Sequence, residues 1–432
     1  MALPTALEVV PPPAPIRARV NVPGSKSETN RALILGALGD GTITLHGALW
    51  SDDTQVMVEC LRTLGVAIEI SPDPTEPSNR TLVVHGTGGV LAPGGTEDEP
   101  AELFVGNAGT ATRFLLAFVA LGSGAYRLSG VPRMHERPQA ALIQALRQLG
   151  YRIDAPGDSL PAVVHGGGRR PGRCQVSIRD SSQFASALLM CAERGGWEVE
   201  VVDANADESP YVVMTEQMIP TYRTPVDHQI EGDASSASYL VGANLLEQLR
   251  WGEGGEFVEV ANWPTSGWQF DQRFHAFCAD ARAGRVPAEV SRTTDLADSI
   301  MTAIVVAPFL SKPVRFTGLE RLRVQECDRV MALHQGLSRC GARVDMEGDD
   351  LVVHPSTLHG AEIETFEDHR VAMCFAMLGL FVPGIVILGP ACVSKTFPDF
   401  FRKLAAPAPD GLGATIRDAS DGHVLTDAEL GD

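Results

Sequence analysis

The chain has 432 residues, 44% of them hydrophobic, which is enough for about two domains of ordinary size with large cores. Its 54 acidic residues against 35 basic ones give a net charge of −19, so nucleic acid and anionic membranes are repelled over most of the surface. A small anion could still bind where basic residues gather locally.

Eight cysteines occur singly, and the chain contains no C-x-x-C and no H-E-x-x-H. Isolated cysteines are typical of reduced cytosolic thiols, so we expect neither a disulfide framework nor a metal site. The N-terminal stretch lacks the basic start and the apolar run of a signal peptide, and we expect a short disordered or extended arm. The most apolar stretch, 371–388, is broken by Pro383 and Gly384 and is too short on either side to span a bilayer, so we expect a soluble protein.

Only four of the 35 basic residues are lysines, and two of these stand in polar motifs near opposite ends of the chain. Lys26 is part of P-G-S-K-S-E-T-N-R, and Lys395 is part of S-K-T-F-P-D-F. Where arginine is otherwise preferred, a retained lysine indicates a need for a compact point charge. These two lysines are therefore the first candidates for functional residues.

Six segments that are apolar on nearly every side predict buried helices. Each follows a polar stretch, and they begin at Arg31, Ala111, Phe184, Ala234, Asp298 and Val371. Between them, amphipathic helices that end in a glycine lead into strands, as in C-L-R-T-L-G-V-A-I-E-I, A-L-R-Q-L-G-Y-R-I-D and G-L-S-R-C-G-A-R-V-D. The pattern predicts an α/β protein of about six repeated α/β units, three to a domain.

A buried helix must direct its free N–H groups and the positive end of its dipole toward something polar. Any one of the Ser, Thr or Asp residues before these helices would serve as an ordinary N-cap. Six such helix starts in one chain, several of them beside Lys or Arg, favour instead a cleft that binds anions.

The first motif is the best candidate for such a site. Ser25 and Glu28 fit a capping box, which places Lys26 and Ser27 in the first turn of a helix, with Arg31 on the same face as Ser27. A Walker P-loop requires Gly immediately before its Lys, and Ser25 stands there instead, so an ATPase is not indicated.

A second motif, G-N-A-G-T-A-T-R-F, predicts another anion-binding loop. Gly106 and Gly109 flank Asn107 and allow close approach of the backbone to a ligand. Thr110 is the expected cap of the following helix, and Arg113 lies one turn in.

Two further motifs add polar groups. G-V-P-R-M-H-E-R-P supplies Arg133 and Arg137 in a rigid loop bounded by prolines, where plain solvation is the alternative for either arginine. D-S-S-Q-F-A-S-A-L-L-M places Ser181, Ser182 and Gln183 at the start of a buried helix.

These four motifs are followed by E-G-D-A-S-S-A-S-Y, R-V-Q-E-C-D-R, E-D-H-R-V-A-M and S-K-T-F-P-D-F. In this order the eight motifs resemble those of the 5-enolpyruvylshikimate-3-phosphate synthase (EPSP synthase) family, over about residues 17–404. The resemblance implies an α/β fold of two similar domains, each with three repeated α/β units whose buried helices point at the interdomain cleft, an inside-out α/β barrel. It also implies a discontinuous outer domain, 1–24 and 233–432, an inserted domain, 25–232, and an active site in the cleft between them.

The family transfers the enolpyruvyl group of phosphoenolpyruvate to the 5-hydroxyl of shikimate 3-phosphate, in the shikimate pathway to chorismate and aromatic amino acids. Both substrates are polyanions, and neither a cofactor nor a metal is implied. By match to the family's motifs, shikimate 3-phosphate would contact Lys26, Ser27, Arg31, Ser181, Ser182, Gln183, Asp298 and Gln325. Phosphoenolpyruvate would contact Lys26, Asn107, Gly109, Arg133, Gln183, Arg329, Arg370 and Lys395.

The resemblance gives catalytic roles to Lys26, Asp298 and Glu326, since the addition needs a base for the hydroxyl and an acid for the methylene carbon. Without the resemblance, the position of Asp298 favours its interpretation as the N-cap of a buried helix. Arg323 and Arg329 flank Glu326 and should favour its ionised form, which opposes a role as resting proton donor unless substrate anions neutralise these arginines.

The chain departs from the family's pattern at two places. Gln325 stands where the family usually has a lysine, so one positive charge is lost, and Arg321 would restore it. Glu208 stands where the family usually has a phosphate-binding serine, so either Ser209 takes over by a local shift or that contact is absent. His369 is an orienter or relay, or else an ordinary core or solvent-facing histidine.

Two other functions are alternatives. A UDP-N-acetylglucosamine enolpyruvyl transferase would share the fold, but its opening motif differs and its reactive loop cysteine has no match. A non-catalytic phosphometabolite-binding protein would need neither Asp298 nor Glu326. The room beside Gly109 predicts sensitivity to glyphosate, and we expect a cytoplasmic monomer, or a plastid protein if a transit peptide has been removed.

Overall fold

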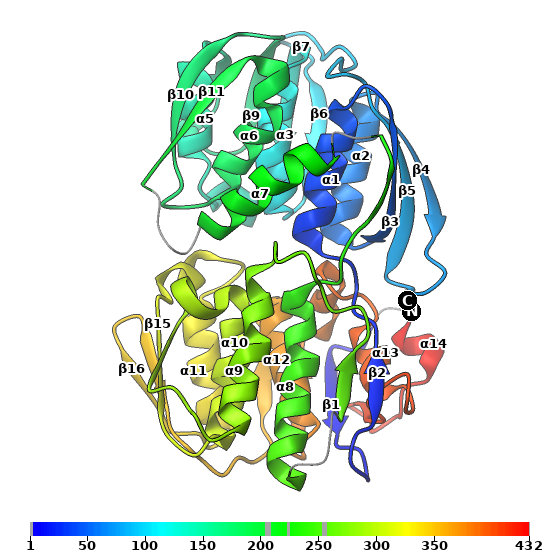
Figure 1. The fold of residues 1–432 in the computed structure, drawn as a ribbon, viewed down its shortest axis with the longest axis vertical. Helices are drawn as coiled ribbons and strands as arrows, with labels where there is room; N and C mark the ends of the chain where they lie inside the picture. Colours follow the sequence, from blue (N-terminus) through cyan, green and yellow to red (C-terminus); the bar gives the residue numbers. More distant parts are fainter. Residues whose placement is uncertain (1–2, 204–208, 223–224, 253–256, 432) are drawn as a thin grey trace. The chain divides into compact units, whose positions relative to one another are not determined.

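The computed structural model describes residues 3–203, 209–222, 225–252 and 257–431. The chain divides into two units, one formed by Met1–Pro23 and Gly232–Asp432 and the other by Gly24–Glu231. The first unit is therefore discontinuous in sequence, as the blue and the green-to-red parts of the ribbon show (Figure 1).

The unit 24–231 contains three buried helices that contact one another: α1 (Lys26–Leu38), α3 (Gly109–Ala120) and α6 (Gln183–Gly195). Its three sheets have the strand orders β12-β3-β5-β4, β6-β7-β9-β8 and β10-β11. The strands are β3 (Thr42–Leu49), β4 (Ala67–Pro72), β5 (Asn79–His85), β6 (Ala101–Phe104), β7 (Ser123–Ser129), β8 (Arg152–Asp154), β9 (Ala162–Gly167), β10 (Gly172–Ser177), β11 (Trp197–Val202) and β12 (Asp227–Gln229). The other helices are α2 (Asp52–Thr63), α4 (Pro132–Glu136), α5 (Ala140–Gln148), α7 (Ser209–Tyr222) and the short turn η1 (Pro156–Asp158).

The discontinuous unit also has three buried helices in mutual contact: α8 (Ala234–Trp251), α10 (Ile300–Val306) and α12 (His369–Gly379). Its sheets have the orders β18-β19-β1-β20, β14-β15-β17-β16 and β13-β2. The strands are β1 (Ala6–Val10), β2 (Ala18–Val20), β13 (Val258–Val260), β14 (Glu289–Ser291), β15 (Val314–Thr317), β16 (Val344–Glu347), β17 (Asp350–Val353), β18 (Glu362–Glu364), β19 (Ile385–Leu388) and β20 (Thr415–Asp418). The other helices and short turns are α9 (Phe274–Arg282), α11 (Arg329–Arg339), α13 (Phe400–Ala405), α14 (Asp427–Leu430), η2 (Phe270–Arg273), η3 (Arg292–Leu296), η4 (Ala297–Ser299), η5 (Ala307–Phe309), η6 (Glu320–Val324) and η7 (Pro390–Lys395).

The four-stranded sheets share one topology, in which a parallel pair is extended by two antiparallel pairings. A parallel pair requires a crossover connection, and here the crossover contains a buried helix. Thus α3 connects β6 to β7, α10 connects β14 to β15, and α12 connects β18 to β19. In register, Leu103 lies opposite Leu128 and Ile363 opposite Ile387, and all four side chains are buried. Each crossover helix therefore begins just beyond the carboxyl end of a strand, where polar groups can be presented.

The predicted helix-to-strand turns are confirmed. Helices α2, α5 and α11 are followed by Gly65, Gly150 and Gly341, whose φ angles are 89°, 82° and 87°. Such positive angles favour glycine because it has no Cβ. The residue after each glycine donates its N–H to a carbonyl in the last turn, as Val66 does to Leu61, which closes a Schellman motif.

The predicted buried helices are confirmed, with one difference in detail. All twelve residues of α3 are buried, and in α12 every residue except Arg370 is buried. The helix expected from Asp298 begins only at Ile300, after the turn η4. The N-terminal arm is extended, because β1 pairs antiparallel with both β19 and β20.

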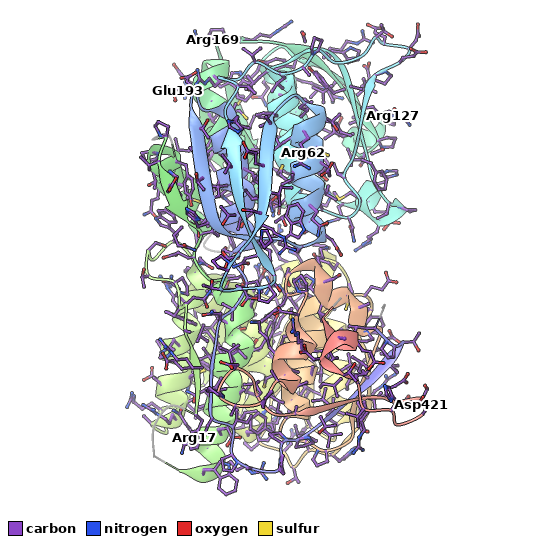
Figure 2. All side chains as sticks on the ribbon, turned by 90° about the vertical axis from the view of Figure 1, so that its right-hand side faces the viewer. Arg17, Arg62, Arg127, Arg169, Glu193 and Asp421 are labelled. Atoms are coloured by element: carbon purple, nitrogen blue, oxygen red, sulfur yellow. The ribbon has the colours of Figure 1, made fainter. Side chains whose placement is uncertain are left out.

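Charged side chains lie on the outside of the units. Figure 2 labels six of them, all exposed: Arg17, Arg62, Arg127, Arg169, Glu193 and Asp421. The charges that are buried are therefore exceptions that need a reason. None of the described helices is long and apolar enough to cross a membrane.

Candidate functional site

Lys26 is the first residue of α1, with Ser25 as the N-cap. The Ser25 hydroxyl accepts the Glu28 N–H, so the N-cap half of the predicted capping box is confirmed. The reciprocal half was wrong, because the Ser25 N–H donates to the Glu231 carbonyl. Lys26 Nζ lies 3.2 Å from Asp53 Oδ2, and the side chain of Lys26 is only 17% exposed. Asp53, in the first turn of α2, is a residue that the sequence did not single out. Asp53 thus keeps the ammonium group of Lys26 next to the N-terminus of α1. The positive end of the helix dipole and this ammonium group together favour binding of an anion there.

Arg31 is buried inside the unit 24–231. Its Nε donates to Thr215 Oγ1 at 2.7 Å, its Nη2 donates to Ser186 Oγ at 3.2 Å, and its Nη1 donates to the Ser27 carbonyl at 2.9 Å. Burial lowers the pKa of Arg31 to about 10, which leaves the guanidinium charged at neutral pH. Arg31 therefore connects α1, α6 and α7 by hydrogen bonds. A contact between Arg31 and substrate remains a prediction.

The start of α3 differs from the prediction. The helix begins at Gly109 with Ala108 as the N-cap, so Thr110 lies within the first turn, and its assignment as the cap was wrong. The hydroxyl of Thr110 instead accepts from Gln183 Nε2 at 3.1 Å, while Arg113 Nη1 donates to Gln183 Oε1 at 2.6 Å. Gln183 thereby joins the starts of α3 and α6.

The segment with Arg133 and Arg137 is helical and not a loop, because residues 132–136 form α4. Arg133 has a 42% exposed side chain and forms an ion pair of 2.7 Å with Glu136. Arg137 is buried, and its Nη1 donates to the Asn107 carbonyl at 3.1 Å. A Cβ on Gly109 would lie 2.7 Å from Arg137 Nη2. Arg137 thus supports the Asn107–Gly109 loop.

Two details, one in the loop before α3 and one at the start of α6, indicate a polar site. Asn107 Oδ1 is buried and has no hydrogen-bond partner among the described residues. Ser181 and Ser182 are also buried, with Ser182 as the N-cap of α6 and Ser181 Oγ accepting the Gln183 N–H at 3.3 Å. A buried amide oxygen without a partner is costly, so this place is suited to a polar ligand or to water.

In the discontinuous unit, Asp298 lies between two arginines. Its Oδ1 is 3.2 Å from Arg292 Nη2, and its Oδ2 is 3.2 Å from Arg370 Nη2. Burial acts to raise the pKa of Asp298, but the charges of Arg370, Arg292 and Arg329 outweigh it and hold this pKa well below the usual range. The N-cap of α10 is Ser299, so the interpretation of Asp298 as the N-cap was wrong.

Glu326 is likewise held between two cations. Its Oε2 accepts from Arg329 Nη2 at 2.9 Å, and its Oε1 accepts from Lys395 Nζ at 3.0 Å. The expected flanking role of Arg323 was wrong, because Arg323 pairs with Asp328 and Asp349. Lys395 is brought in from the end of η7 instead.

Arg329 and Asp368 form a buried ion pair, with 2.7 Å between Nε and Oδ2. Burial acts to lower the pKa of Arg329, but the charges of Asp368 and Glu326 raise it above the usual value. Asp368 is the N-cap of α12 and also accepts the Arg370 N–H at 2.9 Å. His369 is 1% exposed, so the solvent-facing alternative was wrong, while a role as orienter or relay stays a prediction.

The residues at which the chain departs from the family pattern lie in two segments, before α11 and at the start of α7. Gln325 and Arg321 are half-buried in the segment that includes η6 and precedes α11. Ser209 is the first residue of α7, and Glu208 lies outside the described residues. The functional candidates that sequence reasoning missed are Asp53 and Arg292, each recognisable only from the charged partner it meets in space.

Comparison with known proteins identifies one family over most of the chain. The family model described as EPSP synthase (3-phosphoshikimate 1-carboxyvinyltransferase) matches residues 10–229 and 220–404. A 3-phosphoshikimate 1-carboxyvinyltransferase of Rhizobium etli is 40% identical over 440 residues, covering 95% of this chain and 98% of the relative. One from Pseudomonas syringae pv. tomato is 38% identical, with the same coverage of 95% and 98%.

Two solved structures share the fold. An EPSP synthase from Acinetobacter baumannii has a TM-score of 0.68 at 22% identity, covering 95% of this chain and 99% of its own. The enolpyruvyl transferase NikO from Streptomyces tendae has a TM-score of 0.63 at 15% identity, covering 96% and 99%. At these identities the likeness concerns the fold alone.

Proposed function

Because the chain belongs to the EPSP synthase (3-phosphoshikimate 1-carboxyvinyltransferase) family, we propose which of its residues carry out the reaction of that family. The enzyme transfers the enolpyruvyl group of phosphoenolpyruvate to the 5-hydroxyl of shikimate 3-phosphate and releases phosphate by addition and elimination. The alternative of a UDP-N-acetylglucosamine enolpyruvyl transferase is not favoured, because the relatives that match nearly the whole chain carry the shikimate name.

The observation that carries the proposal is the pair of carboxylates, Asp298 and Glu326, each held between two cations. An acid or base that must change protonation during a reaction is placed where charges control it. We assign Asp298 as the base for the 5-hydroxyl and Glu326 as the acid for the methylene carbon.

The hydroxyl oxygen bonds to C2 of phosphoenolpyruvate while its proton passes to Asp298, and Glu326 donates a proton to C3. In the elimination, Glu326 takes a proton back from the new methyl group, the double bond reforms, and the C2–O bond to phosphate breaks. Asp298 returns its proton to the leaving phosphate.

Asp298 is a weak base while its arginines are unengaged, because they hold its pKa low. An anionic substrate that engages Arg370 would share its charge and raise the basicity of Asp298. Substrate binding would therefore prepare Asp298 to act as the base.

The proposed contacts are those that the match to the family's motifs implies. Shikimate 3-phosphate is assigned to Lys26, Ser27, Arg31, Ser181, Ser182, Gln183, Asp298 and Gln325. Phosphoenolpyruvate is assigned to Lys26, Asn107, Gly109, Arg133, Gln183, Arg329, Arg370 and Lys395, with Lys26 as the point charge nearest both substrates. Arginine forks suit carboxylate and phosphate, and lysines act as compact charges.

Phosphate release from phosphoenolpyruvate and shikimate 3-phosphate tests the proposal. Wild-type enzyme should release phosphate, and Asp298→Asn and Glu326→Gln should each lower kcat by about 100-fold or more, since about 100-fold is the lower end of what one acid or base contributes. The matched control is Asp345→Asn, which removes a partly exposed carboxylate of β16 that pairs with His354 and Arg343. Unchanged kcat in both site variants would refute the assignment. We further propose a cytoplasmic monomer, in keeping with eight free thiols.

A further inference from the structure

We propose that Asp271 is a positioning residue for Asp298: its carboxylate holds the peptide group that follows Asp298 and so determines where the Asp298 side chain stands. The inference rests on the proposed role of Asp298 as the base. Asp271 itself is assigned no contact with substrate.

The geometry is specific. Asp271 lies in η2 and is 5% exposed. Its Oδ1 accepts the Ser299 N–H at 2.6 Å, and its Oδ2 accepts the Ser235 hydroxyl at 2.7 Å. The Ser299 N–H belongs to the same planar peptide group as the carbonyl of Asp298. Fixing that plane fixes one end of the Asp298 residue.

The segment that carries Asp271 is anchored a second time. Gln269 Oε1 accepts the Ala234 N–H at 2.8 Å, and Gln269 Nε2 donates to the Gly232 carbonyl at 2.8 Å. Gln269 thus binds the start of α8, while Asp271 binds both Ser235 in α8 and the turn before α10. Asp271 therefore holds the turn before α10 against a rigid helix start.

The turn that carries Asp298 has a strained backbone, which requires stabilising contacts. It follows the π-helical turn η3, and Ala297, the residue just before Asp298, has a φ of 46°, a conformation that alanine rarely adopts. Strained backbone persists only where the surroundings determine it. Without Asp271, the Ser299 N–H would lose its acceptor in the interior of the protein.

The charge of Asp271 is the second observation. Burial and, after it, the neighbouring charge of Asp298 together raise the pKa of Asp271 to about 6, while the charge of Arg370 opposes this rise. A neutral side chain could also accept an N–H without this unfavourable charge. The structure therefore keeps Asp271 for the hydrogen bonds that its oxygens accept, although burying its charge beside Asp298 costs free energy.

The test compares kcat with KM in the full-length enzyme. We expect Asp271→Ala to lower kcat by about 10-fold or more while both KM values stay within about 3-fold, since the loss falls on the transition state. Asp271→Asn can still accept the Ser299 N–H through its amide oxygen, so it should keep kcat within about 3-fold of wild type. The matched control is Ser235→Ala, which removes the other hydrogen bond of Asp271 and should leave kcat within about 3-fold.

A double-mutant cycle distinguishes positioning from general support. If Asp271 acts through Asp298, Asp271→Ala should cost little in a protein that already carries Asp298→Asn. A full-size loss in that background, or equal losses of kcat from Asp271→Ala and Ser235→Ala, would overturn the inference alone. Unchanged kcat in Asp298→Asn by itself would overturn the proposed role of Asp298 and the inference with it.

If thermal unfolding shows that Asp271→Ala does not fold, Asp271→Ser, which is too short to keep both bonds, takes its place under the same criteria.

Discussion

Glu326 and Lys395 are 69 positions apart in the sequence, and their charged atoms lie 3.0 Å apart. Arg329 contacts the other oxygen of the same carboxylate at 2.9 Å. Both cations are proposed to bind phosphoenolpyruvate, so the carboxylate and the substrate compete for the same positive charges. The arrival of substrate would then release Glu326 from its ion pairs.

The first prediction concerns Lys395. Replacing it by methionine keeps the length of the side chain and removes a charged contact worth about 1.5–3 kcal/mol, so KM for phosphoenolpyruvate should rise by about 10- to 100-fold. Steady-state kinetics at saturating shikimate 3-phosphate measure this. Lys403→Met is the control, because Lys403 is as buried as Lys395 and pairs with Asp399 at 3.4 Å. Equal KM values for the two variants would contradict the assignment of Lys395.

The second prediction concerns the pH dependence of kcat. The Arg292 guanidinium helps to hold the pKa of Asp298 below its usual range, so Arg292→Gln should raise that pKa. A base works only while ionised, and its activity is lost as the pH falls through its pKa. The acid limb of the kcat profile should therefore move to higher pH in Arg292→Gln.

The control for this shift is Arg273→Gln. Arg273 donates to the Thr294 carbonyl of the same π-helical turn, so its removal takes away a nearby charge without touching Asp298. Its acid limb should coincide with that of the wild type. A shift of the limb to lower pH in Arg292→Gln would be the wrong sign and would remove Asp298 from the role of base.

The third prediction concerns Gly109. The methyl group of Gly109→Ala would lie 2.7 Å from Arg137 Nη2, so the guanidinium must move and weaken its hydrogen bond to the Asn107 carbonyl. Loss of one charged hydrogen bond, about 1.5 kcal/mol or more, should raise KM for phosphoenolpyruvate by about 10-fold. Arg137→Ala should reproduce this rise if the methyl group acts through Arg137. A normal KM in Arg137→Ala would show that the effect is local to Gly109.

The fourth prediction concerns stability. Gly150 has a φ of 82°, and the nearest atom to an added Cβ is Arg170 Nη1 at 3.6 Å, so the site has room but an unfavourable backbone angle. Gly150→Ala should lower the free energy of unfolding by about 1–2 kcal/mol, whereas Gly150→Asn should lose less, because Asn tolerates left-handed angles. Urea unfolding followed by circular dichroism measures both. Equal losses would mean that side-chain crowding and not backbone strain limits this turn.

Local features were predictable because their causes are local. The glycine turns at Gly65, Gly150 and Gly341 follow from the absence of a Cβ, and the start of α1 follows from Ser25, whose hydroxyl accepts an N–H three residues on. The prediction failed where two local solutions compete. Thr110 fits a cap, yet α3 begins two residues earlier than a cap at Thr110 implies, since the turn at Gly106, with a φ of 52°, places Ala108 before the helix.

Sequence patterns alone therefore established the apolar helices, their polar starts and the family of the chain, since periodicity and contiguous motifs are written within a few residues. Sequence patterns could not establish which charged side chains contact one another in the folded protein. Arg31 meets Thr215 at a separation of 184 residues, and Arg329 meets Asp368 at 39. The electrostatic field at a carboxylate depends on distance in space and on burial. Only the folded chain brings Arg292 to Asp298, and Asp271 to the peptide that follows it.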